Sequence, residues 1–254
     1  MKLAALIFDV DGTLADTEEA HRRAFNLAFE QLAIGWNWSK PAYAHLLLTA
    51  GGKERIAAYI ASLPVTPAER QALNGRIGEI HRIKTGHFTR MVLAGEVPLR
   101  DGVRRLIDEA SRLCVRICIA STTTYANIEA LLRTNLGPDA LERFAVIGAA
   151  DDAERKKPAP DIYEYVLRRL PVGTEECVAL EDSANGLRAA KAAGLYTVVT
   201  PSYWTRTEDF SAADLVLPSL GSPERPLPAR AAALVGSGML GIRDIDRQLN
   251  AVRA

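Results

Sequence analysis

The stretch "ALIFDVDGTLADTEEAH", residues 5–21, decides the fold, because it begins like a buried strand and ends like a helix. The apolar run 5–8 predicts a strand that leads directly into Asp9, with Asp11 two positions further on. Successive side chains of a strand point to opposite faces, so Asp9 and Asp11 should project to the same side at its carboxyl end. Two such carboxylates repel each other, and the surrounding fold must neutralise their charge.

The rest of the chain alternates short apolar runs with helical patterns. Helices are expected between and after the strands, for example at 127–133, 162–170 and 187–193. This alternation predicts an α/β fold in which helices cover both faces of a parallel sheet. The runs that predict strands are 3–8, 115–120, 144–147, 177–180, 197–199 and 215–217.

About a hundred residues separate the first two predicted strands, far more than one crossover helix needs. We therefore expect a helical domain, residues 16–92, inserted into a catalytic core made of residues 1–15 and 93–254. The tail from Gly221 begins as a proline-rich connector and ends in an amphipathic helix, 242–252, that should pack on the core. Helical periodicity in the long interval covers 18–32, 43–48, 54–62, 67–93 and 103–113.

Composition excludes several classes of protein. Lys plus Arg and Asp plus Glu number 31 each, so no net field attracts nucleic acid or an anionic membrane. The longest uncharged stretch, 231–242, is shorter than the roughly 20 residues of a membrane span. Cys114, Cys118 and Cys177 lie in or beside apolar runs, without the spacing of zinc ligands. We expect buried free thiols in a cytoplasmic protein that is a monomer.

Polar residues follow most of the predicted strands. Ligands of an open parallel sheet bind outside the carboxyl ends of its strands, so residues at those ends are candidates for one site. The candidates at these ends are Asp9 and Asp11 after the first strand, Ser121 and Thr122 after the second, Lys157 near the third, and Glu181 and Asp182 after the fourth.

These residue types suit phosphoryl transfer. Carboxylates are the hard oxygen ligands that Mg²⁺ prefers, and Mg²⁺ together with Lys157 would neutralise the aspartate pair. A hydroxyl, backbone N–H groups and an ammonium suit phosphate oxygens. Asp9 can then attack phosphorus to form an aspartyl phosphate. Asp11 can protonate the leaving oxygen and later deprotonate the attacking water.

The four segments resemble the motifs of the haloacid dehalogenase superfamily: "DVDGT", the strand ending in Ser121, "KKP" and "LEDS". The resemblance covers roughly residues 1–220 and implies a Rossmann-like core with a helical C1 cap. It also implies that Asp9 is the nucleophile, Asp11 the acid/base, and Ser121 and Lys157 the phosphate ligands. Magnesium would be bound by Asp9, the Asp11 carbonyl and Asp182, with Glu181 assisting.

Within that superfamily, "EEAHRRAFN", "GGKERIA", "HRIKT", "IASTTTYANIEAL" and "KKPAPDIY" resemble the CbbY-type phosphatases of sugar bisphosphates. The implied substrate is xylulose 1,5-bisphosphate, an inhibitory by-product of Rubisco in the Calvin cycle. Lys53 and Arg55, after the flexible Gly52, would then bind the second phosphate, and Lys84 would add to that pocket. Glu18 and His21 would contact sugar hydroxyls.

Other interpretations remain open for the function and for the cap residues. A phosphosugar mutase like β-phosphoglucomutase uses the same four motifs, although Thr13 is more typical of a phosphatase. A non-enzymatic module with a phosphorylatable aspartate is a more distant alternative, disfavoured because every catalytic group is present. Lys53 and Arg55 would serve equally well as surface charges, Glu18 as a partner of the helix dipole, and His21 as a residue on a solvated helix face.

Overall fold

The structure is a computed structural model that describes residues 1–49 and 51–252. The chain divides into two compact units, which are treated separately below. The core unit consists of residues 1–16 and 98–254, and the helical unit of residues 17–97. The chain therefore returns to the core unit after Val97, later than position 92, where the sequence pattern placed the boundary.

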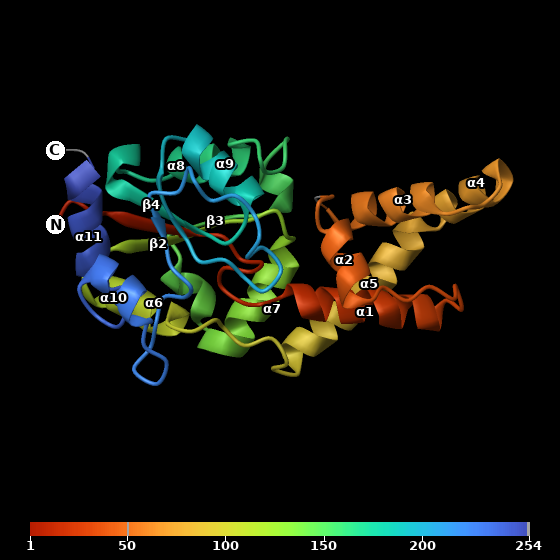
Figure 1. Cartoon of the computed structure of the whole chain (residues 1–254), viewed down its shortest axis with the longest axis horizontal. Helices are drawn as coiled ribbons and strands as arrows, with labels where there is room; N and C mark the ends of the chain where they lie inside the picture. The colour runs from red at the N-terminus through yellow and green to blue at the C-terminus, as the bar shows by residue number, and fades with distance from the viewer. Residues whose placement is uncertain (50, 253–254) are drawn as a thin grey trace. The chain divides into compact units, whose positions relative to one another are not determined.

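The core unit is built on a parallel sheet with the strand order β3-β2-β1-β4-β5-β6 (Figure 1). Each predicted strand is present, with its ends shifted by one or two residues. The central position of β1 explains its apolar sequence, since every residue of 5–8 is buried. The strands are β1 (Ala5–Phe8), β2 (Arg116–Ala120), β3 (Val146–Gly148), β4 (Cys177–Glu181), β5 (Tyr196–Val199) and β6 (Leu215–Val216).

Helices pack on both faces of this sheet. In Figure 1, α8 and α9 lie over one face and α6 over the other. Ile7, Cys118, Ile162 and Ala190 belong to the hydrophobic cluster that joins α8 and α9 to the strands. The helices of the sheet are α6 (Val103–Arg112), α7 (Tyr125–Leu136), α8 (Asp161–Leu167) and α9 (Ala184–Ala192), with the short 3₁₀ helices η1 (Ala140–Arg143), η2 (Ala150–Asp152) and η3 (Thr174–Glu176).

The C-terminal segment forms α10 (Ala229–Val235) and α11 (Ile242–Val252). The prediction that the last helix packs on the core is confirmed, because α11 contacts α6. The Asp246 carboxylate of α11 also accepts hydrogen bonds from the main-chain N–H groups of Lys2 and Leu3, at 2.6 and 2.8 Å. This contact fixes the start of the chain beside α11, as Figure 1 shows.

The helical unit contains an aromatic core between α1 and its neighbours. Phe25 and Phe29 of α1 pack against Trp38, which is fully buried. Helices α1 and α5 make the most extensive helix–helix contact of this unit. Its helices are α1 (Glu18–Gln31), α2 (Lys40–Leu46), α3 (Gly52–Ser62), α4 (Pro67–Gly75) and α5 (Ile77–Leu93).

Two expectations about the helices and the cysteines are wrong. The pattern 67–93 predicted one helix, but α4 ends at Gly75 and α5 begins at Ile77. Asn74 and Gly75 are weak helix formers, so the chain turns there. Cys114 was expected to be buried, but it is exposed. It lies just after α6 with a positive φ of 57°, in the position that normally ends a helix and faces solvent.

The other two cysteines are buried free thiols, as expected. Burial raises the pKa of the Cys118 thiol to about 12, so it stays protonated and unreactive. No helix within residues 1–49 and 51–252 is long and apolar enough to cross a lipid bilayer.

Candidate active site

The register of the sheet brings the polar strand ends together. Phe8, the last residue of β1, pairs with Leu180 of β4 and with Ile119 of β2. Asp9 therefore lies beside Glu181. On the other side of β1, Ser121 comes two positions after Ile119, the β2 residue that pairs with Phe8. The main-chain N–H of Asp9 donates to the Leu180 carbonyl at 3.0 Å, which continues the ladder to the catalytic edge.

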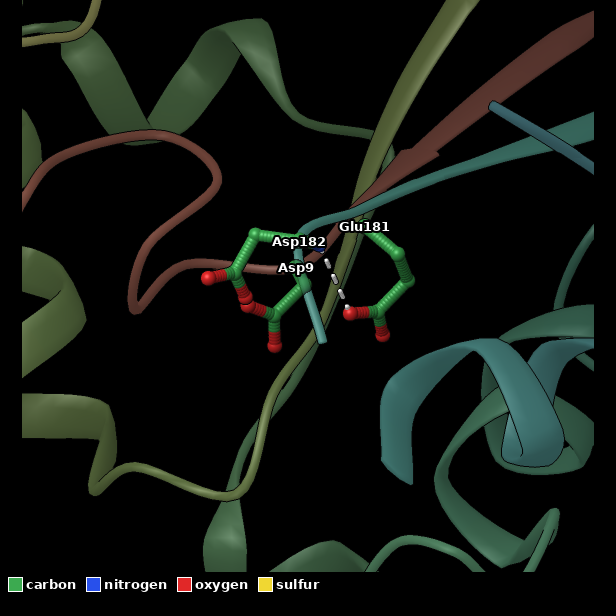
Figure 2. Close-up of side chains that lie close together, drawn as sticks. All are labelled: Asp9, Glu181 and Asp182. Carbon is green, nitrogen blue, oxygen red and sulfur yellow. Dashed lines mark hydrogen bonds between the residues drawn. The ribbon is translucent and has the colours of Figure 1, made fainter. Parts of the chain in front are cut away.

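Three carboxylates form a buried acidic cluster at this edge. One oxygen from each of Asp9, Glu181 and Asp182 lies within 4.8 Å of the others. Figure 2 shows the three side chains at the ends of β1 and β4. Its dashed line marks the Asp182 N–H donating to Glu181 Oε2 at 3.3 Å. The sequence pattern predicted that these three residues would lie at one edge of the sheet, and in the structure they lie together there.

Two glycines allow the close packing around the cluster. A Cβ atom at Gly12 would lie 2.2 Å from Asp182 Oδ2, and Gly12 has a φ of +84°. A Cβ atom at Gly186 would lie 1.9 Å from Glu181 Oε2. Both contacts are far shorter than van der Waals distance. A side chain at either position would push a carboxylate of the cluster out of place.

Lys157 supplies the positive charge inside the cluster. Its buried Nζ donates to Asp9 Oδ1 and to Glu181 Oε1, each at 2.6 Å. Tyr163 of α8 donates its hydroxyl to the same Glu181 oxygen at 2.5 Å, and Lys157 Nζ lies 5.0 Å from the Tyr163 ring centroid. Lys157 and Tyr163 together fix the orientation of Glu181 and keep Lys157 directed at Asp9.

The electrostatics of the cluster favour an added positive charge. Burial, together with Glu181 and Asp11, raises the pKa of Asp9 to about 7 despite the opposing Lys157. Burial and the charges of Asp9 and Glu181 also raise the pKa of Asp182 well above its usual value. Burial would lower the pKa of Lys157, but the charges of Asp9 and Glu181 raise it above its usual range. The carboxylates outweigh the single ammonium of Lys157.

The remaining core candidates lie at the same edge with different exposure. Ser121 is buried, its N–H donates to the Gly148 carbonyl at 3.0 Å, and its Oγ accepts from the Thr123 N–H at 3.2 Å. Thr122 is half-buried. Asp11 is half-buried in the turn after β1. The carboxylate of Asp11 is not part of the acidic cluster within the described residues.

The candidates of the helical unit form two buried networks. Arg55 is buried, with Nη1 donating to the Tyr43 hydroxyl at 2.8 Å and Nε to the Leu46 carbonyl at 3.2 Å. The Tyr43 hydroxyl in turn donates to Glu18 Oε2 at 2.7 Å. The interpretation of Arg55 as a surface charge is therefore wrong, because its guanidinium bonds hold α2 to α3.

The second network contains His21 and Lys84, which lie 2.8 Å apart between Nδ1 and Nζ. His21 stacks on Phe88 and is buried, so a solvated position for it is wrong. Gly52 is closely covered, since a Cβ there would lie 2.7 Å from His81 Nε2. Burial, followed by the charges of Lys84 and Lys53, lowers the pKa of His81 to about 4. Lys53 itself is exposed.

Several residues at the acidic edge had no assigned role in the sequence. Tyr163 lies within the motif "KKPAPDIY", so its spacing from Lys157 was a signal that could have been used. Thr205 donates to Asp182 Oδ2 at 3.1 Å, and it belongs to an irregular segment without periodicity. Arg100, which contacts the turn after β1, was also missed.

A model of the haloacid dehalogenase-like hydrolases matches residues 3–194. The chain belongs to this haloacid dehalogenase-like hydrolase family, and it is a phosphatase of that type. It is similar to Protein CbbY, plasmid, of Cupriavidus necator, with 50% identity over 89% of this chain and 89% of that protein. The resemblance to CbbY-type proteins seen in the motifs is thereby confirmed.

Solved structures agree with this assignment. CbbY from Rhodobacter sphaeroides, solved as a mutant in complex with xylulose 1,5-bisphosphate, has 48% identity and a TM-score of 0.79. The match covers 87% of this chain and 98% of that one. A β-phosphoglucomutase from Clostridium difficile matches 99% of both chains with a TM-score of 0.70 and 19% identity, which shows the shared fold alone.

Proposed function

We propose that this protein removes one phosphate from a sugar bisphosphate, and that the substrate is xylulose 1,5-bisphosphate. The observation that carries the proposal is the buried Asp9–Lys157 pair beside Glu181 and Asp182, in a chain half identical to a CbbY protein. A CbbY relative was solved with xylulose 1,5-bisphosphate, which supports the choice of substrate.

The acidic cluster fits a magnesium ion. Its donors are carboxylate oxygens, which Mg²⁺ prefers. Burial first, and then the neighbouring carboxylates, raise the pKa values of Asp9 and Asp182, so a bound cation would stabilise their charged forms. Asp9 and Asp182 would hold the ion together with the main-chain carbonyl of Asp11, and Glu181 would assist. When bound, the ion neutralises charge on the carboxylates and on the phosphate oxygens.

The chain's own residues account for the two displacement steps. Asp9 attacks phosphorus, so an Asp9 oxygen–phosphorus bond forms while the bond from phosphorus to the sugar oxygen breaks. Asp11 gives its proton to that sugar oxygen, then accepts one from the water that cleaves the aspartyl phosphate. Ser121, Thr122 and Lys157 hold the phosphoryl oxygens during both steps.

The helical unit supplies candidates for binding the phosphate that is not removed. Burial first, and then the charges of Lys84 and Lys53, lower the pKa of His81, so two lysines lie near this residue, and their positive charge would attract a phosphate. Lys53 is exposed near the start of α3, where backbone N–H groups also attract anions. Glu18 and His21 are the candidates for contacts with sugar hydroxyls, and Arg55 holds Tyr43 and Glu18 in place.

Replacing Lys53 by glutamine should reduce activity on bisphosphates selectively. A charge-assisted contact to phosphate contributes roughly 1.5–3 kcal/mol, and the exposure of Lys53 favours the lower end. We expect kcat/KM for xylulose 1,5-bisphosphate to fall about tenfold. Small monophosphates, which have no second phosphate, should keep their rates. Steady-state kinetics on both substrate classes measure this difference.

Arg70→Gln is the matched control for Lys53→Gln. Arg70 belongs to α4 and donates to the Ile60 and Ala61 carbonyls, at the opposite end of α3 from Lys53. Its loss should lower the stability of the helical unit without changing the preference for bisphosphates. Equal losses on both substrate classes in Lys53→Gln would place the second phosphate elsewhere.

Tyr163→Phe tests the proposed role of the lysine–glutamate pair. The change removes the hydroxyl that donates to Glu181 but keeps the ring beside Lys157. One such bond contributes roughly 1–1.5 kcal/mol, so kcat should fall about five- to tenfold. Tyr165→Phe, on the same helix but packed against Arg169, is the control and should keep wild-type kcat. A wild-type kcat in Tyr163→Phe would contradict this role.

The decisive test of the function is phosphate release from a panel of sugar phosphates in the presence of Mg²⁺. Xylulose 1,5-bisphosphate should have the highest kcat/KM, above ribulose 1,5-bisphosphate. The panel should include β-glucose 1-phosphate, the substrate type of the mutase alternative. Interconversion of glucose phosphates without net release of phosphate would overturn the proposal in favour of a mutase.

A further inference from the structure

Arg100 connects two loops on opposite sides of the acidic cluster. Its side chain is nearly buried, with 11% exposed. Nη1 donates to the Gly12 carbonyl in the turn after β1 and to the Thr200 carbonyl after β5, the latter at 2.7 Å. Nη2 donates to the Pro201 carbonyl at 3.0 Å. A planar guanidinium can hold carbonyls from separate loops in this way, whereas an ammonium cannot keep the same fork geometry.

Both loops lead directly to Asp182. On one side, Gly12 lies against the Asp182 carboxylate so closely that a Cβ atom would overlap with it. On the other side, Pro201 leads into Ser202, whose Oγ lies 3.0 Å from Thr205 Oγ1, and Thr205 donates to Asp182 Oδ2 at 3.1 Å. Arg100 therefore closes a ring of contacts in which the Asp182 carboxylate is held from both sides.

The main chain of Arg100 strengthens this connection. Its N–H donates to the Leu14 carbonyl at 2.9 Å, within the same turn that carries Asp11 and Gly12. Leu99, the preceding residue, forms an antiparallel bridge with Ala15. A shift of the Arg100 side chain would therefore change the separation between the β1 turn and the β5 loop.

We propose that Arg100 is a positioning residue of the active site, which holds the Asp182 carboxylate in place by joining the turn after β1 to the loop after β5. The inference deepens the proposed function, since Asp182 is one of the proposed magnesium ligands. Arg100 itself does not touch the Asp182 carboxylate through a hydrogen bond that the described structure contains.

Arg105 is a matched control within the same unit. Its Nη2 also donates to main-chain carbonyls, those of Leu220, Gly221 and Leu240, at 3.2, 3.3 and 2.8 Å. These carbonyls belong to the C-terminal segment and not to the loops around Asp182. Arg105→Lys therefore removes a comparable set of structural bonds away from the acidic cluster.

The test compares Arg100→Lys with Arg105→Lys in three measurements on the full chain. Calorimetric titration with MgCl₂ alone should show Mg²⁺ affinity about tenfold weaker in Arg100→Lys and unchanged in Arg105→Lys. Hydrogen exchange should become faster in peptides covering 9–15 and 200–206 only in Arg100→Lys. Melting temperatures should fall by similar amounts in both variants. A third variant, Arg100→Ala, should have a lower kcat than the wild type. Added guanidinium should restore part of that kcat.

These measurements separate the positioning role of Arg100 from the proposed metal site. Wild-type Mg²⁺ affinity in Arg100→Lys, or unchanged exchange in either loop, would overturn the positioning role and leave Arg100 a purely structural residue. A wild-type protein that binds no Mg²⁺ would instead overturn the proposed metal site. The exchange data alone would then decide whether Arg100 joins the two loops, since they depend on neither metal nor substrate.

Discussion

Replacing Asp9 by asparagine is expected to abolish phosphate release, with a loss on the order of 10⁴-fold or more in kcat. An amide does not attack phosphorus, so the aspartyl phosphate cannot form. The change should leave the fold intact, because asparagine has the same size and its oxygen still accepts from Lys157 Nζ. Kinetics should therefore show a lost rate, while the melting temperature stays within a few degrees of wild type.

Asp11→Asn provides the contrast that identifies the nucleophile. With a nitrophenyl phosphate, whose leaving group needs no proton, this variant should still transfer phosphate to Asp9. Hydrolysis of the intermediate should then stall, because no base activates the water. Mass spectrometry should detect phosphorylated protein in Asp11→Asn and none in Asp9→Asn. Turnover by Asp9→Asn within tenfold of wild type would contradict the mechanism.

The core of the site could be predicted because its determinants are local. Each strand is a short apolar run, and polar residues that follow parallel strands meet at one edge of the sheet. Knowledge of the strands was therefore enough to bring Asp9 together with Glu181 and Asp182, although about 170 residues separate them in the chain.

The supporting contacts could not be predicted in the same way. Arg100 reaches Gly12 and Thr200 across 88 and 100 positions, and no pattern near Arg100 marks these carbonyls as its partners. Arg55 shows the opposite problem, since the local pattern allowed a charge on a helix surface. Packing of α2 on α3 buries Arg55 against Tyr43, so only the surface position is wrong. Such contacts depend on which irregular segments fold back on each other, which periodicity does not encode.

Removing divalent cations is expected to eliminate activity, by on the order of 10³-fold or more, and Mg²⁺ should restore it. The physical reason is the charge of the cluster, where Asp9, Glu181 and Asp182 face Lys157 in a buried site. A bound phosphate brings further negative charge close to these carboxylates. Calcium should not replace Mg²⁺, since its longer bonds and higher coordination number disturb in-line attack by Asp9.

Thermal unfolding gives a measurement of the metal site that does not depend on activity. Mg²⁺ should raise the melting temperature of the wild type and have little effect on Asp182→Asn, which lacks one carboxylate of the cluster. Full activity in excess chelator, or an equal Mg²⁺-induced rise in both proteins, would rule out this site.

The pKa of Asp9 determines how the Mg²⁺-induced rise in melting temperature depends on pH. Its folded-state pKa of about 7 lies above the usual 3.8, so folded Asp9 holds a proton that the unfolded chain releases. Without Mg²⁺, this group therefore lowers stability progressively as pH rises from about 4 to about 7. Mg²⁺ binds the charged form, so its affinity should weaken by up to about tenfold per pH unit below pH 7. The Mg²⁺-induced rise in melting temperature should accordingly be larger at pH 8 than at pH 6, and the reverse order would show that Asp9 is not a ligand.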